Sequence, residues 1–392
     1  AGGNGMKFMG YRRPDGRVGI RNKVLIMPTC VCSADVARIV SSNVNGTVTF
    51  HNQNGCGQIG KDFQMTMDIE AGYAANPNVY GTVLIGLGCE EHQVSLVTEA
   101  IRKRTNKPLV SFVIQEVGGT IKTVELATRA AQKMVIEASR VSRTECNVSE
   151  LILGTNCGGS DPTSGVSANV VMGYASDKLV SLGGTSILSE TPELLGAEHI
   201  LAGRAVNEEV AKSIYRITKD FEDHFKNVGY DVRDGDPSPG NFVGGITTLE
   251  EKSLGCIKKA GNAPIQAVIE YAHQIDNIKG LVIMDTESHD PSSVAAMAAG
   301  GAQMCVFSSG RGSPTGNPII PVIKITGNKF TFEKMSDNID FDTSGMLYGQ
   351  STIEELGEDL FELILDVAEG MMTKNEILGI TEMAIGRQCN YT

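Results

Sequence analysis

Three cysteines of this 392-residue chain lie in glycine-rich segments that follow predicted strands. Cys56 lies in Gly-Cys-Gly, Cys89 in Gly-Cys-Glu and Cys157 in Asn-Cys-Gly-Gly. Three thiolates could hold one iron, or three corners of an iron–sulfur cluster whose fourth iron stays open. An open iron is a Lewis acid that binds a hydroxyl and a carboxylate together. The competing interpretation is three unconnected cysteines, because free Cys is often buried.

Residues 154–165, around Cys157, combine a thiol, a carboxylate, hydroxyls and four glycines. A loop that only packs does not need this mixture, whereas a loop that lies against a ligand does. We therefore expect one wall of an active site here, with Ser160 and Asp161 as substrate contacts. We expect no shared site for the remaining cysteines, which are Cys30, Cys32, Cys146, Cys256, Cys305 and Cys389.

Candidate acids and bases stand near the same strand ends. His51 opens the segment around Cys56, and His92 closes the segment around Cys89. Imidazole titrates near neutral pH, so either side chain could transfer a proton or bind a metal. Lys252 and Lys324 could each serve as a base if they were desolvated. The competing interpretation of each is a polar loop or surface residue.

Candidate substrate contacts are polar side chains that follow strands, and arginines in polar or glycine-rich segments. A guanidinium captures a carboxylate through two parallel hydrogen bonds. The competing interpretation is a solvated side chain or a surface ion pair, which is the commoner case. The candidates are Arg17, Arg21, Gln115, Glu116, Ser160, Asp161, Glu190, Glu193 and Arg311.

Apolar runs alternate with amphipathic segments along the chain, which predicts an α/β fold with doubly wound, mainly parallel sheets. In such sheets ligands bind outside the carboxyl ends of the strands. A chain of 392 residues exceeds one ordinary core. We expect two Rossmann-like domains, residues 6–145 and 149–392, with a polar boundary at 143–149. Expected strands include 23–29, 80–86, 108–114 and 319–325, and expected helices include 63–75, 95–104 and 166–182.

Composition excludes several classes of protein. The net charge is −12, no basic stripe offsets it and Trp is absent, which argues against nucleic-acid binding. No apolar segment reaches the ~18 residues that a membrane span needs. Nine cysteines without a secretory signal favour a cytoplasmic protein with reduced thiols. Residues 1–5 are expected to be a processing or cloning remnant.

Eight ordered segments carry a resemblance to a known family. They are Gly-Tyr-Arg-Arg-Pro-Asp-Gly-Arg-Val-Gly-Ile-Arg-Asn ending at Asn22, Gly-Cys-Gly at 55–57, Gly-Leu-Gly-Cys-Glu at 86–90, Gln-Glu-x-Gly-Gly-Thr at 115–120, Cys-Gly-Gly-Ser-Asp at 157–161, Glu-x-Pro-Glu at 190–193, Gly-Gly-Ile-x-Thr-Leu-Glu-x-Lys-Ser-Leu-Gly at 244–255 and Gly-Arg-Gly at 310–312. Together they resemble the altronate/galactarate dehydratase family over nearly all of residues 10–392. The resemblance implies a sugar-acid hydro-lyase that needs Fe²⁺. A [4Fe–4S] cluster and Mn²⁺ are the alternative cofactors.

One departure from the family concerns the start of the chain. Full-length members carry a small β-rich domain before the Gly-Tyr-x-Arg segment, and this chain starts almost at that segment. It therefore resembles the large subunit of split members, whose small domain is a separate polypeptide. Sulfolactate sulfo-lyase, which eliminates sulfite, has this arrangement. We expect a separate small subunit and a homo-oligomer, with water or sulfite as the leaving group.

Three functional hypotheses follow. The first is metal-dependent β-elimination from a sugar acid such as altronate or galactarate, giving a 2-keto-3-deoxy acid. The second is a nucleotide-binding regulatory module, although neither Gly-x-Gly-x-x-Gly after the first strand nor a Walker loop is present. The third is a scaffold subunit with a degenerate site, which the polar residues retained in the glycine loops disfavour.

Overall fold

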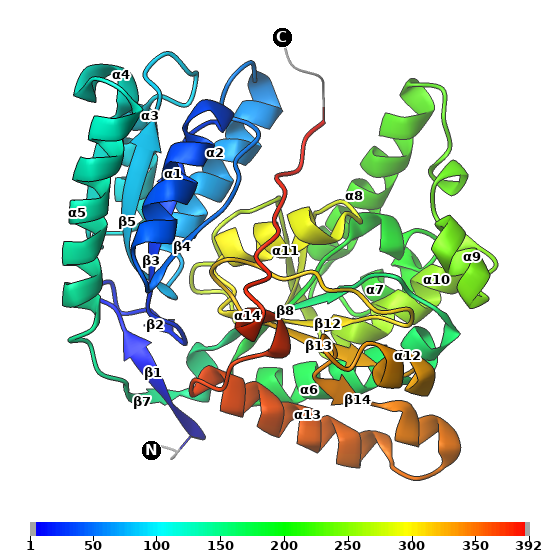
Figure 1. Cartoon of the computed structure of the whole chain (residues 1–392). Coiled ribbons are helices and arrows are strands. Elements are labelled where there is room, and N and C mark those ends of the chain that lie inside the picture. Colours follow the sequence, from blue (N-terminus) through cyan, green and yellow to red (C-terminus); the bar gives the residue numbers. More distant parts are fainter. Residues whose placement is uncertain (1–4, 389–392) are drawn as a thin grey trace.

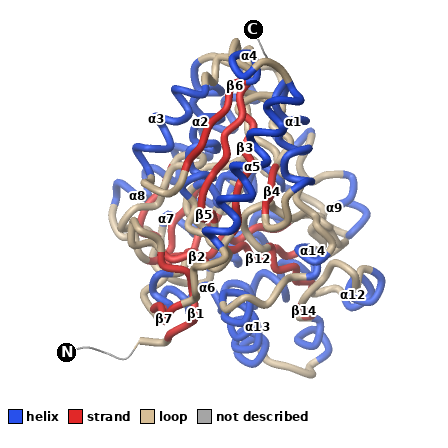
Figure 2. Tube along the Cα trace, turned by 60° about the vertical axis from the view of Figure 1, so that its left-hand side comes forward, coloured by secondary structure: helices blue, strands red, loops and turns tan. Residues whose placement is uncertain are grey.

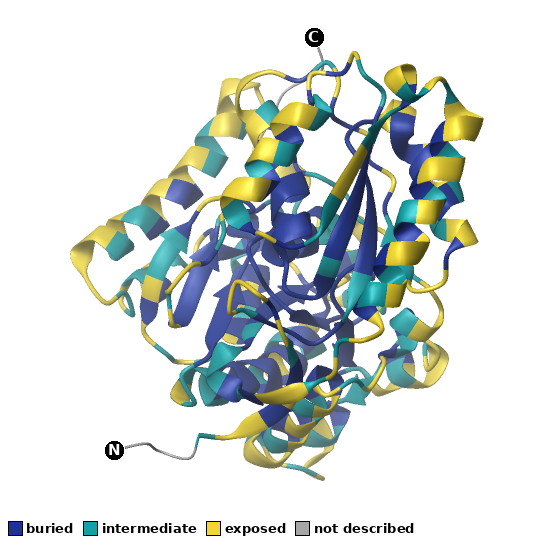
Figure 3. Cartoon of the chain, turned by 90° about the vertical axis from the view of Figure 1, so that its left-hand side faces the viewer, coloured by how far each residue is buried: buried dark blue, intermediate teal, exposed yellow. Residues whose placement is uncertain are grey.

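The computed structural model describes residues 5–388 of the chain. Cys389 and residues 1–4 of the expected N-terminal remnant lie outside the described residues. The central strands of both main sheets are buried, and the outward faces of the helices are exposed (Figure 3). Within residues 5–388, no helix has the length and apolar character needed to cross a membrane.

The first half of the chain forms a small parallel sheet in the order β4-β3-β5-β6. Its strands are β3 (Lys23–Pro28), β4 (Thr47–Thr49), β5 (Val79–Gly86) and β6 (Leu109–Val113). The apolar residues of β3 and β5 point to both faces, so helices must cover both. Figure 2 shows the upright strands between α1 (Val31–Asn43) and α5 (Thr120–Ala138) on one face and α2 (Gly60–Ala75) and α3 (Val94–Arg104) on the other.

The second half forms a large parallel sheet in the order β10-β11-β9-β8-β12-β13-β14. Its strands are β8 (Ile152–Cys157), β9 (Thr185–Leu188), β10 (Ile265–Ile269), β11 (Gly280–Met284), β12 (Met304–Ser308), β13 (Val322–Thr326) and β14 (Phe341–Asp342). The first of these in sequence, β8, lies between β9 and β12, so the winding reverses there. Such a switch point is where doubly wound sheets bind ligands. The expected doubly wound α/β class is confirmed.

Helices cover both faces of the large sheet (Figure 1). One face packs against α6 (Asn169–Ser181), α8 (Glu208–Asn227) and α13 (Ile353–Ala368). The other packs against α11 (Asp290–Ala299). The helix expected at 166–182 instead starts with a π-helical turn, Ser164–Ala168, before α6 begins.

A small antiparallel sheet, β2-β1-β7, joins the start of the chain to the segment between the two main sheets. Its strands are β1 (Lys7–Arg12), β2 (Val18–Gly19) and β7 (Thr144–Asn147). Residues 143–149 were expected to be only a polar boundary. An edge strand with one solvent-facing side is polar enough to look like a loop, which explains the difference.

The two main sheets share one hydrophobic core. Helix α2 of the small sheet packs on α11 of the large sheet, and residues from both helices belong to the same buried cluster as Leu25, Leu84 and Phe307. At Gly72 in α2, a Cβ atom would lie 2.5 Å from the carbonyl oxygen of Ala299. This close approach holds the two sheets together.

Candidate functional site

Two glycine-rich segments meet where the large sheet reverses its winding. One follows β8 and the other follows β12. The backbone N–H of Arg311 donates to the carbonyl of Gly159 at 2.9 Å. A Cβ atom at Gly310 would lie 2.1 Å from Asp161 Cγ, so only glycine permits this packing. The two segments therefore form one continuous surface.

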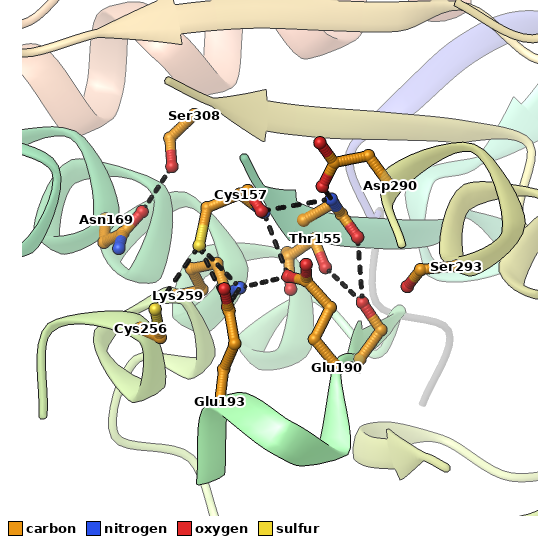
Figure 4. A network of polar contacts seen from close by, with 12 residues as sticks. Thr155, Cys157, Asn169, Glu190, Glu193, Cys256, Lys259, Asp290, Ser293 and Ser308 are labelled. Carbon is orange, nitrogen blue, oxygen red and sulfur yellow. Dashed lines mark hydrogen bonds and ion pairs between the residues drawn. The ribbon is translucent and has the colours of Figure 1, made fainter. Parts of the chain in front are cut away.

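A buried ammonium group joins the side chains that follow β8 and β9 (Figure 4). Lys259 Nζ donates to Glu190 Oε2 at 2.6 Å, Glu193 Oε2 at 3.0 Å and Cys157 Sγ at 3.0 Å. The Cys157 thiol donates to Glu193 Oε2 at 3.1 Å, and its sulfur lies 3.5 Å from Cys256 Sγ. Each of these five residues, which we call the buried network, is at most 2 % exposed.

Charges within the buried network decide which groups are ionised. Burial lowers the pKa of Lys259, but Cys157 and the two carboxylates outweigh burial, so the pKa is raised and the ammonium persists. Burial, followed by the charge of Glu193, raises the pKa of Glu190 well above its usual value. Burial also raises the pKa of Glu193, but Lys259 and Lys252 lower it below its usual range. Neighbouring carboxyl groups with different proton affinities are the arrangement that acid–base catalysis uses.

Glu190 stands in a left-handed backbone conformation, with φ 71° and ψ 69°. This conformation is costly for a residue with a Cβ atom, and such strain is concentrated at functional sites. The Glu190 N–H donates to Thr286 Oγ1 at 2.8 Å, and Oε2 accepts from the Cys157 N–H at 3.1 Å. Its other oxygen, Oε1, is buried without a partner among the described residues. The turn thus presents one satisfied and one free carboxylate oxygen.

Cys157, Glu193 and Cys256 are the one group among residues 5–388 whose ligand atoms all lie within 4.8 Å of one another. Two sulfurs and a carboxylate suit a transition-metal ion such as iron. The hydrogen bond with Cys256 lowers the pKa of Cys157, and Lys259 acts in the same direction, which favours the thiolate that a metal needs. The donor set fits a single ion, and the Lys259 ammonium is the cation with which that ion would compete.

Lys252 and Lys324 have opposite environments. Lys252 Nζ lies 3.2 Å from Glu193 Oε1 and 2.5 Å from Asp236 Oδ1. Burial lowers the pKa of Lys252, but Glu193, Cys256 and Asp236 raise it by more, so Lys252 stays protonated and is a poor base. Lys324 on β13 is fully buried, and its Nζ, 3.5 Å from the centroid of the Phe307 ring, has no hydrogen-bond partner within the described chain. Burial lowers the pKa of Lys324 to about 7.

The three thiols predicted to share a metal do not meet. Cys157 belongs to the buried network of the large sheet, whereas Cys56 and Cys89 are exposed on the loops that follow β4 and β5 of the small sheet. Among residues 5–388, no hydrogen bond or ion pair joins Cys157 to either loop. Cys157 therefore groups with Glu193 and Cys256, whereas Cys56 and Cys89 follow strands of the other sheet.

The two candidate histidines lie in the same loops of the small sheet. His92 is buried, its Nδ1 lies 2.8 Å from Glu70 Oε2, and its ring packs 4.4 Å from that of Phe63. Its Nε2 has no partner in the part of the chain that is described. His51 is exposed at the start of its loop. Neither histidine contacts the buried network.

Only one of the three candidate arginines is free to capture a carboxylate. The five N–H groups of Arg21 donate to the Glu376 carboxylate and to three backbone carbonyls, so Arg21 is a structural residue. Arg17 pairs with Asp15 at 2.6 Å. Arg311 is exposed, and no ion pair or hydrogen bond occupies its guanidinium within residues 5–388.

The remaining predicted contacts divide between the two sheets. Gln115 Nε2 donates to Cys89 Sγ at 3.5 Å, and Glu116 is exposed beside it. Ser160 is 2 % exposed, and its Oγ has no partner among the described residues. Asp161 accepts hydrogen bonds from neighbouring side chains and the backbone. Ser160 and Asp161 therefore lie on the same surface as Arg311. Gln115 and Glu116 lie at the edge of the small sheet instead.

Sequence reasoning missed Cys256 and Lys259. Cys256 was expected to be unconnected, and Lys259 was not considered. A signal was present, because Lys252, Cys256 and Lys259 are spaced by four and three residues and so share one face of a helical segment. That face, on α10 (Leu249–Cys256) and the 3₁₀ turn Ile257–Ala260, points into the buried network.

A cavity of about 270 Å³ borders the Glu190 turn. It lies between α2, α8 and the carboxyl ends of β10 and β11. Thr286, whose hydroxyl accepts from Glu190, lines it, and so do the cationic side chains of Lys61 and Arg216. Asp220, Glu270, Asp285 and Glu287 line the cavity as well, so a carboxylate could lie only against its cationic side, beside Lys61 and Arg216.

Comparison with known proteins covers almost the whole chain. A family model described as D-galactarate/Altronate dehydratase, C-terminal, matches residues 148–390, and one described as D-galactarate dehydratase/Altronate hydrolase, second domain, matches residues 10–139. The chain is 38 % identical to (2R)-sulfolactate sulfo-lyase subunit beta of Chromohalobacter salexigens, over 98 % of both chains. It is 35 % identical to altronate dehydratase of Bacillus subtilis, over 96 % of this chain and 77 % of that one. It is 36 % identical to galactarate dehydratase (L-threo-forming) of Escherichia coli, over 93 % of this chain and 73 % of that one.

Doubly wound sheets and the similarity to dehydratases and a sulfo-lyase subunit place this chain among the α/β lyases. The chain belongs to the D-galactarate/altronate dehydratase family.

Proposed function

We propose that the chain catalyses β-elimination from a hydroxy acid, with water leaving from a sugar acid such as altronate or galactarate. The observation that carries the proposal is the similarity to dehydratases over more than nine-tenths of the chain. A base removes the proton next to the carboxylate, and the hydroxyl on the adjacent carbon leaves as water after it gains a proton. The resulting enol takes up a proton on carbon and becomes a 2-keto-3-deoxy acid.

The surface formed by the segments after β8 and β12 supplies the substrate contacts in this proposal. Arg311 binds the carboxylate, because its guanidinium is free and exposed. Ser160 has an unpartnered hydroxyl for a substrate oxygen. Holding the substrate at two points aligns the bond that breaks with the group that moves the proton.

Two groups near this surface titrate close to neutral pH, as proton transfer requires. Burial lowers the pKa of Lys324 to about 7, and burial with the charge of Glu193 raises the pKa of Asp290 to about 6. Lys324 is our first choice for the base. His51, His92 and Lys252 remain candidate acids or bases, the two histidines at the edge of the small sheet.

The buried network could also carry a metal ion. Cys157, Glu193 and Cys256 would hold it, with Fe²⁺ first and Mn²⁺ as the alternative. When bound, such an ion supplies a Lewis acid that stabilises negative charge on oxygen. Lys259 contributes positive charge to the same place through its own side chain.

Elimination of sulfite is a second candidate. The similarity to the sulfo-lyase subunit extends over 98 % of both chains, more of the relative than either dehydratase match covers. In that reaction a carbon–sulfur bond breaks and the electron pair leaves with sulfite. The name of that relative includes the word subunit, so we also propose a separate small partner subunit for this chain.

A substrate panel tests the proposal. The chain, with and without a co-expressed small partner, would be incubated anaerobically with altronate, galactarate and sulfolactate, and 2-keto acid and sulfite would be measured separately. We expect 2-keto acid from one substrate, with sulfite appearing only if sulfolactate is used. No product from any of the three, together with a thermal shift caused by nucleotides alone, would favour the nucleotide-binding module instead.

Measuring KM for arginine variants tests where the carboxylate of the substrate binds. Arg311→Lys should raise KM at least tenfold, because a lysine cannot form the two parallel hydrogen bonds. Arg129→Lys, on the exposed face of α5, is the matched control and should leave KM unchanged. A rise in KM for Arg216→Lys but not for Arg311→Lys would move the carboxylate to the cavity beside Glu190.

A further inference from the structure

Three exposed thiols gather at the carboxyl edge of the small sheet. Cys32, Cys56 and Cys89 lie on the segments that follow β3, β4 and β5, and all three are exposed. Free cysteine is usually among the most buried residues. The other five described cysteines are buried, so exposure within the described chain is confined to this edge.

Hydrogen bonds connect the segments that carry these thiols. The Val31 N–H, next to Cys32, donates to the Asn54 carbonyl at 3.2 Å. The Gly57 N–H, next to Cys56, donates to Glu91 Oε2 at 2.8 Å. The His92 N–H donates to the Gly55 carbonyl at 3.1 Å. Each cysteine is therefore at most three residues from a direct bond between two of the segments.

Close backbone packing makes this arrangement rigid. A Cβ atom at Gly55 would lie 1.9 Å from the Thr29 carbonyl oxygen, and Gly55 has φ +89°, which favours glycine. The Thr29 hydroxyl donates to Glu90 Oε1 at 2.7 Å, which ties the end of β3 to the residue after Cys89. The backbone that carries Cys56 and Cys89 is therefore held in place without a ligand.

The surroundings of the thiols match those of a metal ligand set. The Gln115 amide donates to Cys89 Sγ at 3.5 Å, and hydrogen bonds to ligand sulfurs are a usual feature of iron–sulfur sites. Cys30 is buried and contacts Ser33 at 3.8 Å, so it is not exposed like the other three.

The three sulfurs do not converge within the reach of one ion, which argues against a single metal bound by all three. A metal–thiolate bond is about 2.3 Å long, so two sulfurs on one ion lie at most about 4.6 Å apart. Cys32, Cys56 and Cys89 are not among the described groups whose ligand atoms all lie within 4.8 Å of one another. A cluster spreads its ligand sulfurs farther apart, because each sulfur binds a different iron.

We propose that Cys32, Cys56 and Cys89 ligate an iron–sulfur cluster at the edge of the small sheet, with one iron free of protein ligands. Each thiol loses its proton to solvent as its sulfur binds iron. The site is separate from the buried network around Cys157. Its iron content can be measured whether or not the lyase reaction is found, so the two proposals can fail independently.

The test is metal analysis of the whole chain. Protein purified anaerobically, and protein reconstituted with iron salts and sulfide, would be assayed for iron, acid-labile sulfide and visible absorbance. A four-iron cluster predicts about four irons and four sulfides per chain. The single variants Cys32→Ser, Cys56→Ser and Cys89→Ser should each lose at least half of the acid-labile sulfide, and the triple variant should lose all of it. Because these side chains are exposed, circular dichroism should show an unchanged fold.

Cys146→Ala is the matched control and should keep the full iron and sulfide content, whereas Cys157→Ser should keep the full sulfide content. A triple variant that retains iron and sulfide would overturn the proposal. So would a wild-type chain that binds neither after reconstitution. Iron that binds without sulfide, and is lost from Cys157→Ser, would place a single ion in the buried network instead.

Discussion

At the scale of single residues, two buried lysines show how neighbours decide the state of an ammonium group. Lys259 has two carboxylates and a thiol within 3.0 Å, and stays charged at full burial. Lys324 has an aromatic ring but no hydrogen-bond partner within the described chain. Burying a charge without a partner is costly, so the neutral amine is favoured at Lys324. Lys259 therefore holds two carboxylates in place by hydrogen bonds, whereas Lys324 is able to accept a proton.

The environment of Lys324 predicts a pH-dependent stability. Its pKa falls from 10.5 to about 7 on folding. As the pH falls from 10.5 to about 7, the unfolded chain takes up a proton that the folded chain does not, so wild-type stability declines, and below pH 7 the penalty is constant. Lys324→Met removes this penalty and should be more stable by a few kcal/mol at pH 7, at about 1.4 kcal/mol per pKa unit. Urea denaturation from pH 6 to 10 measures it.

Lys334→Met is the control, because Lys334 is exposed and its substitution should leave the pH profile of wild type unchanged. Equal pH profiles for wild type and Lys324→Met would show that Lys324 keeps its charge in the folded chain. In that case Asp290 would become the first choice for the base.

At the scale of elements, one helix crossing joins the two sheets. Gly72 on α2 faces Ala299 on α11, where an added Cβ would meet the Ala299 Cβ at 2.7 Å as well as its carbonyl oxygen. Cores are packed so densely that an extra methyl group must displace a helix. The spacing of the two sheets therefore depends on a residue without a side chain.

Gly72→Ala tests this helix crossing, because the crossing determines whether the substitution raises or lowers the free energy of unfolding. In an exposed helix, replacing Gly by Ala stabilises by about 1 kcal/mol. Here the clash should reverse that sign and destabilise the chain by about 1–3 kcal/mol in urea denaturation. Gly240→Ala in α9 (Pro239–Gly244) is the control, because its Cβ meets nothing closer than 3.8 Å. A Gly72→Ala variant as stable as wild type would mean that the helices separate freely.

At the scale of the whole molecule, contacts between distant parts of the chain close the fold. Arg21 lies next to β3 and binds Glu376 in α14 (Lys374–Ile377), a pair 355 residues apart in sequence. It also binds the carbonyls of Val367 and Met371 near the end of α13. One side chain thus fastens the C-terminal helices to the small sheet.

Arg21→Lys should therefore act on stability. A lysine has at most three donors and cannot reproduce the fork of five, so at least two charged hydrogen bonds are lost, which predicts a decrease of roughly 2–3 kcal/mol. Arg17→Lys is the matched control, with a partly exposed ion pair worth less than about 1 kcal/mol. Denaturant unfolding measures both. A change in KM with unchanged stability would instead return Arg21 to the substrate site.

The sequence by itself determined the α/β class, most strands and helices of the two parallel sheets, and which loops carry polar groups. These properties are local, because hydrophobic periodicity and glycine position depend on residues close together in the chain. The eight family segments also indicated the lyase family that the comparisons confirm. The division at residues 6–145 and 149–392 stays a prediction, and the strand β7 inside its boundary shows how an edge strand can resemble a linker.

Which cysteines meet was decided only by tertiary structure. Cys56, Cys89 and Cys157 look alike in sequence, because each follows a strand and adjoins glycine. The fold brings Cys157 at the end of β8 next to Cys256 of α10, and leaves Cys32, Cys56 and Cys89 on segments that follow strands of the small sheet. Sequence spacing contains no information about strand order, because parallel strands are joined by crossovers of variable length. The two arginines near glycine likewise look alike in sequence but differ in the fold. Arg21 is fully hydrogen-bonded and structural, whereas Arg311 is exposed.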